Sequence, residues 1–153
     1  MRISAKADYA VRAAAELAAA QPQGTPVKGE QLAAAQGIPQ KFLENILADL
    51  RHAGLVRTRR GVEGGYALTR PASEIAVADV LRAVEGPLAA VQGVRPEGLR
   101  YGGAAARLPE VWVALRANLR AVLERVTLAD LAAGTLPEGV AVLTTSADAW
   151  QPH

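Results

Sequence analysis

Glycine and proline break the first 86 residues into segments whose apolar patterns are those of helices and one hairpin. Residues 36–39 (QGIP) separate two stretches whose apolar residues have helical spacing. Glycine accepts the left-handed conformation that ends many helices, and proline is favoured at the start of the next helix. The sequence therefore predicts a helix from Gly29 to Ala35, a tight turn, and a helix from Pro39 to about Ala53.

Helices and strands are also indicated on both sides of this turn. An alanine-rich segment from Ala5 to Ala20 lacks Gly and Pro and follows Ser4, whose hydroxyl can cap a helix. From Leu55 the apolar period becomes that of strands, and the segments LVRTRR and YALTR flank the loop GVEGG, which predicts a β-hairpin. A further helix is expected from Val77 to Glu85.

The carboxy-terminal part contains a long helix, expected from Pro109 to Val126. Its apolar residues are spaced alternately four and three apart, a heptad pattern that helices use against a partner helix. The residues of this predicted dimerisation seam are Leu108, Trp112, Leu115, Leu119, Val122 and Val126. The alternative is that the helix packs on its own domain; we favour a homodimer. A capping box at Thr127 and Asp130 predicts a last helix, Leu128 to Ala133.

The expected fold is mainly α with a small β-hairpin wing: a winged helix-turn-helix followed by a long dimerisation helix. The predicted parts are a DNA-binding domain (1–86), a linker or sensor-like loop (87–107), the dimerisation and final helices (108–134) and an irregular tail (135–153).

Composition excludes several classes of function. The chain has no cysteine and only two histidines, His52 and His153, which leaves no thiol nucleophile, disulfide, zinc finger or thiolate-bound cluster. No paired histidine and nucleophile, carboxylate cluster or phosphate-binding glycine loop is present, so we expect no enzyme activity, metal or cofactor. No apolar stretch reaches the ~18 residues of a membrane span. Asp8 and Glu16 interrupt the apolar amino end, which is not typical of a signal peptide, and we expect a cytoplasmic protein.

Charge and exposed side chains indicate double-stranded DNA as a partner. Residues 1–70 hold ten Lys/Arg and six Asp/Glu, whereas 71–153 hold seven and nine. On the helix after the turn, the outward residues are Gln40, Lys41, Glu44 and Asn45, which can pair with base edges; the alternative is a solvated helix face. Arginines near the wing can bind phosphates, or else only protect a strand edge from aggregation: Arg51, Arg57, Arg59, Arg60 and Arg70.

Several motifs together resemble the Rrf2 family of bacterial transcription regulators. They are MRISAKADYAVRAAAELA, GIPQKFLENILADLRHAGLV, RRGVEGGYALTRP and IAVADVLRAVEGP, with Trp112 and TLADL further on. The resemblance implies a homodimeric winged-helix repressor or activator whose long helix crosses over its dimer mate. It implies base contacts from Pro39, Lys41, Glu44 and Asn45, a minor-groove arginine at Arg60, and backbone contacts from Lys6 and Tyr9.

The chain departs from this family in its sensor. Cluster-binding members carry three cysteines before the long helix, whereas Leu88 to Pro109 has none, and Asp8 alone cannot hold a cluster. We therefore expect no iron–sulfur cluster and control by a small molecule or protein partner, acting near the loop Leu88 to Arg107. The alternative function is a protein–protein interaction module with the same fold that has lost specific DNA reading.

Overall fold

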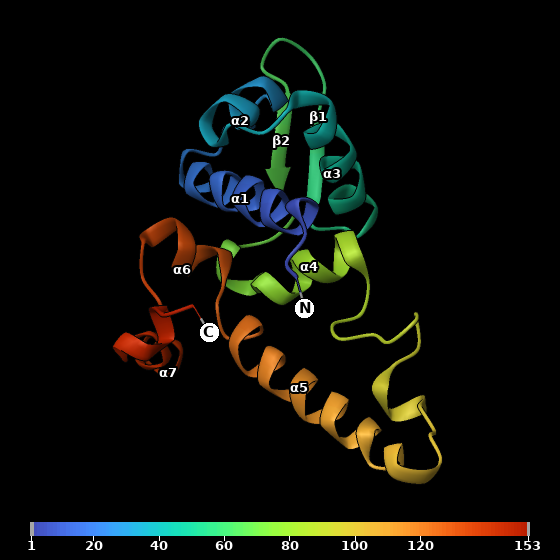
Figure 1. Cartoon of the computed structure of the whole chain (residues 1–153). Coiled ribbons are helices and arrows are strands. Elements are labelled where there is room, and N and C mark those ends of the chain that lie inside the picture. Colours follow the sequence, from blue (N-terminus) through green and yellow to red (C-terminus); the bar gives the residue numbers. More distant parts are fainter. Residues whose placement is uncertain (1, 153) are drawn as a thin grey trace.

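The predicted order of elements is present in the computed structural model, which describes residues 2–152 (Figure 1). Nine helices and strands carry the fold: α1 (Ala5–Ala20), α2 (Gly29–Gln36), α3 (Gln40–His52), β1 (Val56–Arg59), β2 (Gly65–Leu68), α4 (Val77–Glu85), α5 (Leu108–Leu123), α6 (Leu128–Ala133) and α7 (Glu138–Ala141). A mainly helical chain with one antiparallel hairpin confirms the predicted fold class.

Local signals in the sequence set several helix ends. The Ala7 amide donates to the Ser4 hydroxyl at 3.0 Å, which caps α1. Gly37, with φ of +62°, ends α2 in the left-handed conformation. At the start of α6, the Asp130 amide donates to Thr127 Oγ1 (3.1 Å) and the Thr127 amide donates to Asp130 Oδ2 (2.8 Å). The predicted capping box is therefore confirmed.

Helix α1 lies at the centre of the winged domain and packs against α2, α3, α4 and α6. Ala10, Ala13 and Ala14 are almost fully buried and allow the neighbouring helices to approach closely. Leucines and isoleucines of the surrounding elements fill the rest of the core: Leu32, Leu43, Ile46, Leu47, Leu50, Ile75 and Leu128. Since Leu128 belongs to this core, α6 packs on the winged domain rather than with the long helix with which we grouped it.

The hairpin is fastened to the domain by a third backbone segment. Strands β1 and β2 pair from Val56↔Leu68 to Arg59↔Gly65. Val27 pairs with Tyr66 in addition, each amide donating to the other residue's carbonyl at 2.8 Å. This contact holds the start of β2 against the segment that leads into α2.

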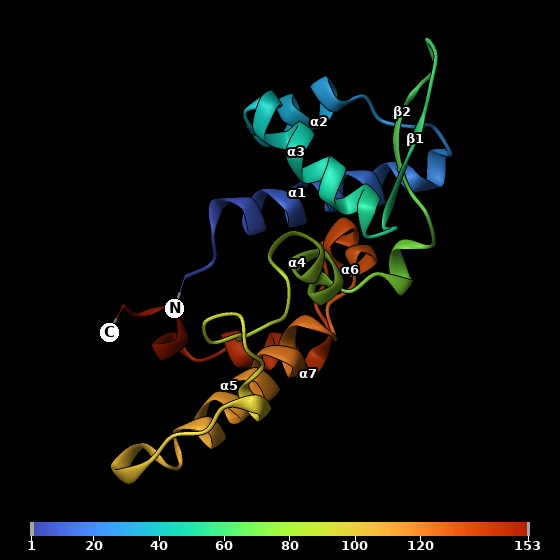
Figure 2. The same cartoon turned by 90° about the vertical axis from the view of Figure 1, so that its right-hand side faces the viewer.

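The linker of residues 86–107 runs from α4 away from the winged domain, and α5 returns beside it (Figure 2). The linker contains two 3₁₀ turns, Pro96–Gly98 and Gly103–Ala105. Helix α5 ends at Leu123, three residues earlier than predicted, because the Val126 carbonyl accepts from the Val77 amide (2.9 Å) next to a bridge between Ala76 and Thr127.

The seam assignment of Val126 needs correction for the same reason. Its side chain is 6% exposed and packs with Val77 and Val140 of its own chain. Val126 is therefore a core residue at the end of α5 and does not continue the helical seam.

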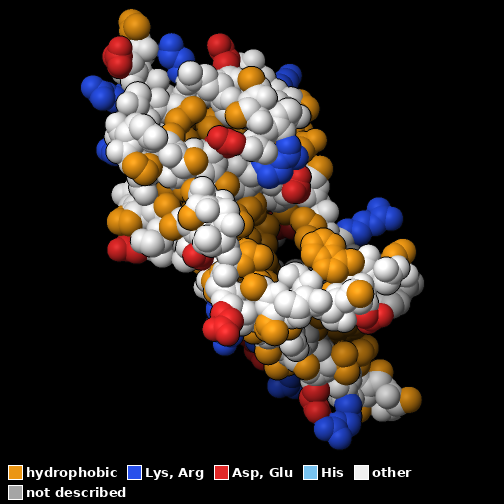
Figure 3. All heavy atoms as spheres, turned by 90° about the vertical axis from the view of Figure 1, so that its left-hand side faces the viewer, with side chains coloured by type: hydrophobic (Ala, Val, Ile, Leu, Met, Phe, Trp, Pro, Cys, Tyr) orange, Lys and Arg blue, Asp and Glu red, His pale blue; other side chains and the backbone are white. Residues whose placement is uncertain are grey.

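The tail is more ordered than predicted. Helix α7 and the 3₁₀ turns Val142–Thr144 and Ala147–Trp150 replace the expected irregular segment, and Val140 anchors them. Figure 3 shows the face that carries α6 and α7, where hydrophobic side chains gather at the junction with the winged domain. Within residues 2–152, no helix is long and apolar enough to cross a membrane.

Candidate nucleic-acid interface

Helix α3 exposes the polar residues that the sequence indicated for base reading. Its buried stripe of Leu43, Ile46, Leu47 and Leu50 faces α1 and the core. The opposite side carries the exposed residues Pro39, Gln40, Lys41, Glu44 and Asn45. An amphipathic helix of this kind can enter a groove with its polar side while its apolar side remains packed.

Phe42 does not belong to the buried stripe of α3, although its spacing from Ile46 is helical. Its side chain is 43% exposed and meets the Tyr9 ring edge-on, with the ring centroids 5.7 Å apart. Phe42 lies about 100° around the helix from Leu43. It therefore reaches only the rim of the α1–α3 contact.

The wing and α3 meet in one groove. Gln40 and Glu44 of α3, Arg59 and Gly61 of the wing, and Lys28 before α2 line a cavity of about 330 Å³. Groups able to pair with bases thus lie beside groups able to bind phosphate. Sequence reasoning missed Lys28, because it lies in a connection whose only signal is a cation directly before a helix.

The first strand of the wing and the residue after it are basic, and their positive charges are free to bind an anion. Val56 is buried, whereas Arg57, Arg59 and Arg60 are exposed. Among the part of the chain that the structure describes, these arginines, Lys41 and Arg51 form no ion pair. Unpaired cations at a hairpin edge can each neutralise a phosphate and release counterions.

Of the predicted contact residues, Gln40, Glu44 and Arg59 line this groove and the others do not. Arg51 is ten residues after Lys41 on α3, about 15 Å along the helix axis. Lys6 pairs with Asp49 at 2.7 Å, so a phosphate would have to compete with that carboxylate. Tyr9 is half-buried, and the Arg12 guanidinium lies 5.3 Å from the centroid of its ring. The structure therefore does not bring these three residues together with Gln40, Glu44 and Arg59.

The proposed partner surface on α5 is only half-buried within one chain. None of the α5 residues is buried; Leu108, Trp112, Leu115, Leu119 and Val122 are intermediate, and Val111 is 55% exposed. The Trp112 indole N–H is shielded, yet it has no hydrogen-bond acceptor among residues 2–152. A long apolar helix left in this state can gain further burial from a partner.

Comparison with known proteins decides the family. A family model described as "Rrf2: Iron-dependent Transcriptional regulator" matches residues 3–134. The chain belongs to the Rrf2 family. It is therefore a helix-turn-helix transcriptional regulator that binds DNA, and not an enzyme.

Individual relatives agree with this assignment. A protein of Mycobacterium tuberculosis strain H37Rv, named as an HTH-type transcriptional regulator, is 57% identical over 143 residues, covering 94% of this chain and 88% of the relative. The HTH-type transcriptional regulator CymR of Bacillus subtilis is 34% identical over 135 residues, covering 88% of this chain and 92% of CymR.

Solved structures of Rrf2-family proteins have the same fold. The structure of CymR, described as the global cysteine regulator of B. subtilis, has a TM-score of 0.73 at 33% identity and covers 88% of this chain and 98% of that one. The structure of T. potens IscR has a TM-score of 0.69 at 29% identity and covers 100% of this chain and 93% of that one.

The family description mentions iron, but the donor groups of this chain do not fit an iron–sulfur cluster. The segment 88–109 has no cysteine or histidine, and its one carboxylate is Glu97. The pKa of Glu97 is lowered, first by its own backbone N–H and then by the Arg116 guanidinium, so it is held as a paired anion. Asp8 pairs with Arg12 at 3.0 Å. In residues 2–152, no three potential metal ligands gather at one place.

Proposed function

We propose that this Rrf2-family regulator binds specific sequences of double-stranded DNA as a homodimer, under the control of a signal other than an iron–sulfur cluster. The observation that carries the proposal is the shared groove of Gln40, Glu44 and Arg59, in which a base-reading helix lies beside a phosphate-binding wing. A regulator of transcription works where the chromosome is, so we place its action in the cytoplasm.

Each side chain at the interface has a role that follows from its chemistry. Helix α3 enters the major groove, where Asn45 pairs with adenine, Glu44 accepts from a cytosine amino group, and Lys41 reaches guanine or a phosphate. Pro39 has no donor and offers only shape and apolar contact. Arg57 and Arg59 bind the backbone beside that groove, and Arg60 reaches the minor groove.

Dimerisation through α5 follows from the half-buried seam. Leu108, Trp112, Leu115, Leu119 and Val122 of one protomer pack against the same residues of its partner. Because α5 points away from α3 and the wing (Figure 1), the pairing leaves both DNA-binding ends free. Two such heads on one DNA face read half-sites about one helical turn apart.

Control by a signal other than a cluster follows because the linker lacks the cysteine and histidine ligands that an iron–sulfur cluster needs. The loop Leu88 to Arg107 contacts α5 and follows α4, so a small molecule or a protein partner bound there can act on both elements. We expect protein purified anaerobically and supplied with iron and sulfide to gain no visible absorption band with stoichiometric iron. Appearance of that band would contradict this part of the proposal.

The test of DNA binding uses fluorescence anisotropy with a double variant of the wing. Arg59→Ala together with Arg60→Ala should weaken binding and flatten the plot of log affinity against log salt by about 4, because the dimer loses four arginines and each cation that neutralises DNA charge contributes about 1. The matched control is Arg100→Ala together with Arg107→Ala, which removes the same charge from the exposed linker and from the N-cap of α5. If the wing variant behaves like the control, the interaction-module alternative is favoured.

The test of dimerisation uses sedimentation of a seam variant. Leu115→Arg places a charge in the middle of the proposed interface and should give a monomer at concentrations where the unchanged protein is a dimer. Val142→Arg is the control, because Val142 is an exposed apolar residue of the tail. Dimers that persist in the Leu115 variant would place the interface elsewhere.

A further inference from the structure

Four arginines converge on a cavity that the DNA interface does not use. The cavity has a volume of about 460 Å³ and lies between α4, the linker and α5, away from the wing. Its charged lining consists of Arg82 of α4, Arg95 and Glu97 of the linker, and Arg116 and Arg120 of α5. The volume falls within the range of small-molecule sites, about 300–1,000 Å³.

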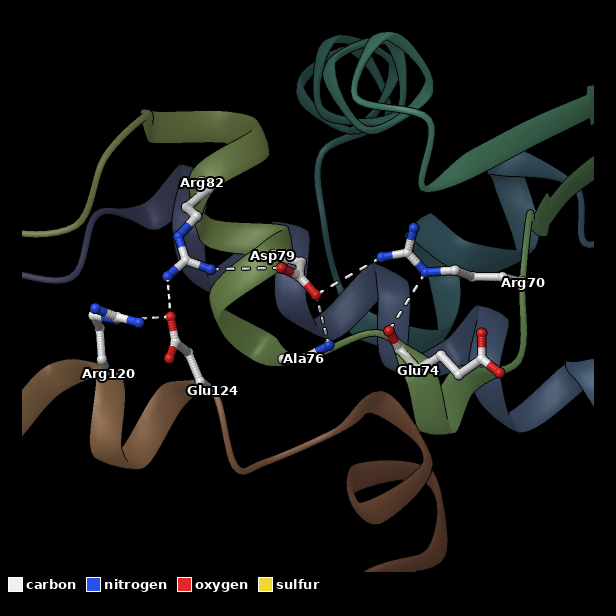
Figure 4. Close-up of polar contacts among 7 residues, drawn as sticks. All are labelled: Arg70, Glu74, Ala76, Asp79, Arg82, Arg120 and Glu124. Atoms are coloured by element: carbon white, nitrogen blue, oxygen red, sulfur yellow. Dashed lines mark hydrogen bonds and ion pairs between the residues drawn. The ribbon is translucent and has the colours of Figure 1, made fainter.

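The arginines are only partly neutralised by carboxylates. Glu124 accepts from both Arg82 and Arg120, and the Arg120 Nε lies 2.9 Å from it (Figure 4). Glu97 pairs with Arg116, whereas Arg95 forms no ion pair within residues 2–152. Hydrogen bonds from Arg120 and Arg82 lower the pKa of Glu124, which keeps it ionised.

A third carboxylate does not balance the site. Asp79 lies 3.5 Å from Arg82, but it is also 3.8 Å from Arg70 and accepts from the Ala76 amide (Figure 4). The extended network thus contains five guanidiniums and three carboxylates. The positive excess is concentrated on the cavity side, where Arg95 acts on Glu97 through its charge but forms no ion pair within residues 2–152.

We propose that this cavity binds a small organic dianion, such as a phosphate monoester or a dicarboxylate, and that the bound anion changes the affinity for DNA. The second half of this inference rests on the proposed function. Guanidinium groups present parallel N–H donors that match the two oxygens of a carboxylate or phosphate. Gly86, Pro87 and Leu88 form the uncharged part of the wall, against which the rest of the ligand packs.

The position of the cavity connects the ligand to the DNA-binding end. Arg82 belongs to the winged domain, whereas Arg116 and Arg120 belong to the helix proposed to pair the protomers. In the structure described here, Glu124 joins α4 to α5 by accepting from Arg82 and Arg120. A dianion that takes these donors replaces Glu124 as the link and alters how α5 meets the winged domain, hence the spacing of the two heads.

Binding to the cavity can be measured without DNA. Isothermal titration of the full chain with phenyl phosphate, a phosphate monoester, and separately with malonate, a dicarboxylate, at constant ionic strength should show saturable binding of at least one of them. Arg95→Gln should weaken it about tenfold, the cost of one charged hydrogen-bond partner. Arg100→Gln should leave it unchanged, because Arg100 is in the same linker and bonds only to backbone carbonyls.

Three outcomes overturn the assignment of the site: no saturable binding of either anion, equal losses in the two linker variants, or loss only when Arg59 and Arg60 are replaced. The last outcome would mean that the anion occupies the wing. A preference for phenyl phosphate or for malonate distinguishes phosphate-type from carboxylate-type ligands. Since Arg95 is exposed and forms no ion pair with any residue that the structure describes, its substitution should leave the circular dichroism spectrum unchanged.

The effect on DNA is measured separately by anisotropy with and without the anion that binds. The affinity should change by about fivefold or more in the unchanged protein and in the Arg100 variant, but not in the Arg95 variant. Equal changes in all three proteins would show screening or competition at the wing and would contradict the coupling. If the anion binds as predicted but no DNA is bound in either state, the proposed function fails while the site stands.

Discussion

Replacing Gly65 with alanine should loosen the wing from the winged domain. Gly65 has a φ of +151° and lies where β2 meets the Val27 segment. A Cβ added there would lie 2.5 Å from the Val27 carbonyl oxygen and 2.6 Å from its carbon. Because these atoms belong to the backbone, the clash is relieved only if the two segments move apart.

The size of the effect follows from the contacts that this movement breaks. The two 2.8 Å hydrogen bonds between Val27 and Tyr66 would be lost, at a net cost of about 1 kcal/mol each. A side chain in this backbone conformation adds about 1 kcal/mol of strain. We therefore expect the free energy of unfolding to fall by about 3 kcal/mol, and binding to DNA to weaken because the wing is no longer fixed beside α3.

Urea unfolding followed by circular dichroism measures this change, and two other glycines provide controls. Gly61 has a φ of +102°, but a Cβ there would meet no atom within contact distance. Gly61→Ala should therefore lower the free energy of unfolding only by the backbone strain of about 1 kcal/mol. Gly102 has an ordinary φ of −101° and open space beside it, so Gly102→Ala should change the free energy of unfolding by less than about 0.5 kcal/mol. A Gly65 variant no less stable than the Gly61 variant would refute the reasoning.

Two further predictions concern the core and the capping box. Leu43→Ala should lower the free energy of unfolding by about 2–5 kcal/mol, because Leu43 is fully buried. Phe42→Ala should lower it by only about 1 kcal/mol, because Phe42 is partly exposed. Equal losses in urea unfolding would contradict the burial of Leu43. The pKa of Asp130 is lowered, first by the Thr127 amide and then by its hydroxyl. Asp130 therefore stabilises the fold above the ordinary Asp pKa of about 4, and this stabilisation is lost as the pH falls through the lowered value. The advantage of the unchanged protein over Asp130→Asn should shrink as the pH falls below about 5, and an advantage that stays constant would show that the cap does not titrate.

Elements with local signals were predictable from the sequence. The bounds of α1, α4 and α6 agree with the prediction, because Ser4, Gly86 and the pair Thr127–Asp130 act within one turn of the helix ends. The exposed side of α3 was predictable as well, since its apolar stripe alone decides which residues face away from the core.

Features that depend on distant segments were not predictable. Apolar spacing alone extends α5 to Val126, whereas the bridge to Ala76 and Val77 ends it earlier. Helix α7 needs the pocket of Val77 and Val126 to anchor Val140. In the same way, Lys28 lines the groove of the candidate interface, and Arg95 lines the same cavity as Arg82, only through the packing of segments that are apart in sequence.

Selection of bound duplexes from a random DNA library, at physiological salt and with excess non-specific competitor, tests the central claim most directly. A homodimer that reads bases with α3 should enrich one palindromic sequence whose half-sites are about one helical turn apart. Substitution of Asn45 by Ala should relax the sequence at one position of each half-site. Retention of duplexes without any enriched sequence would contradict specific reading, and enrichment of a single unrepeated half-site would contradict the homodimer.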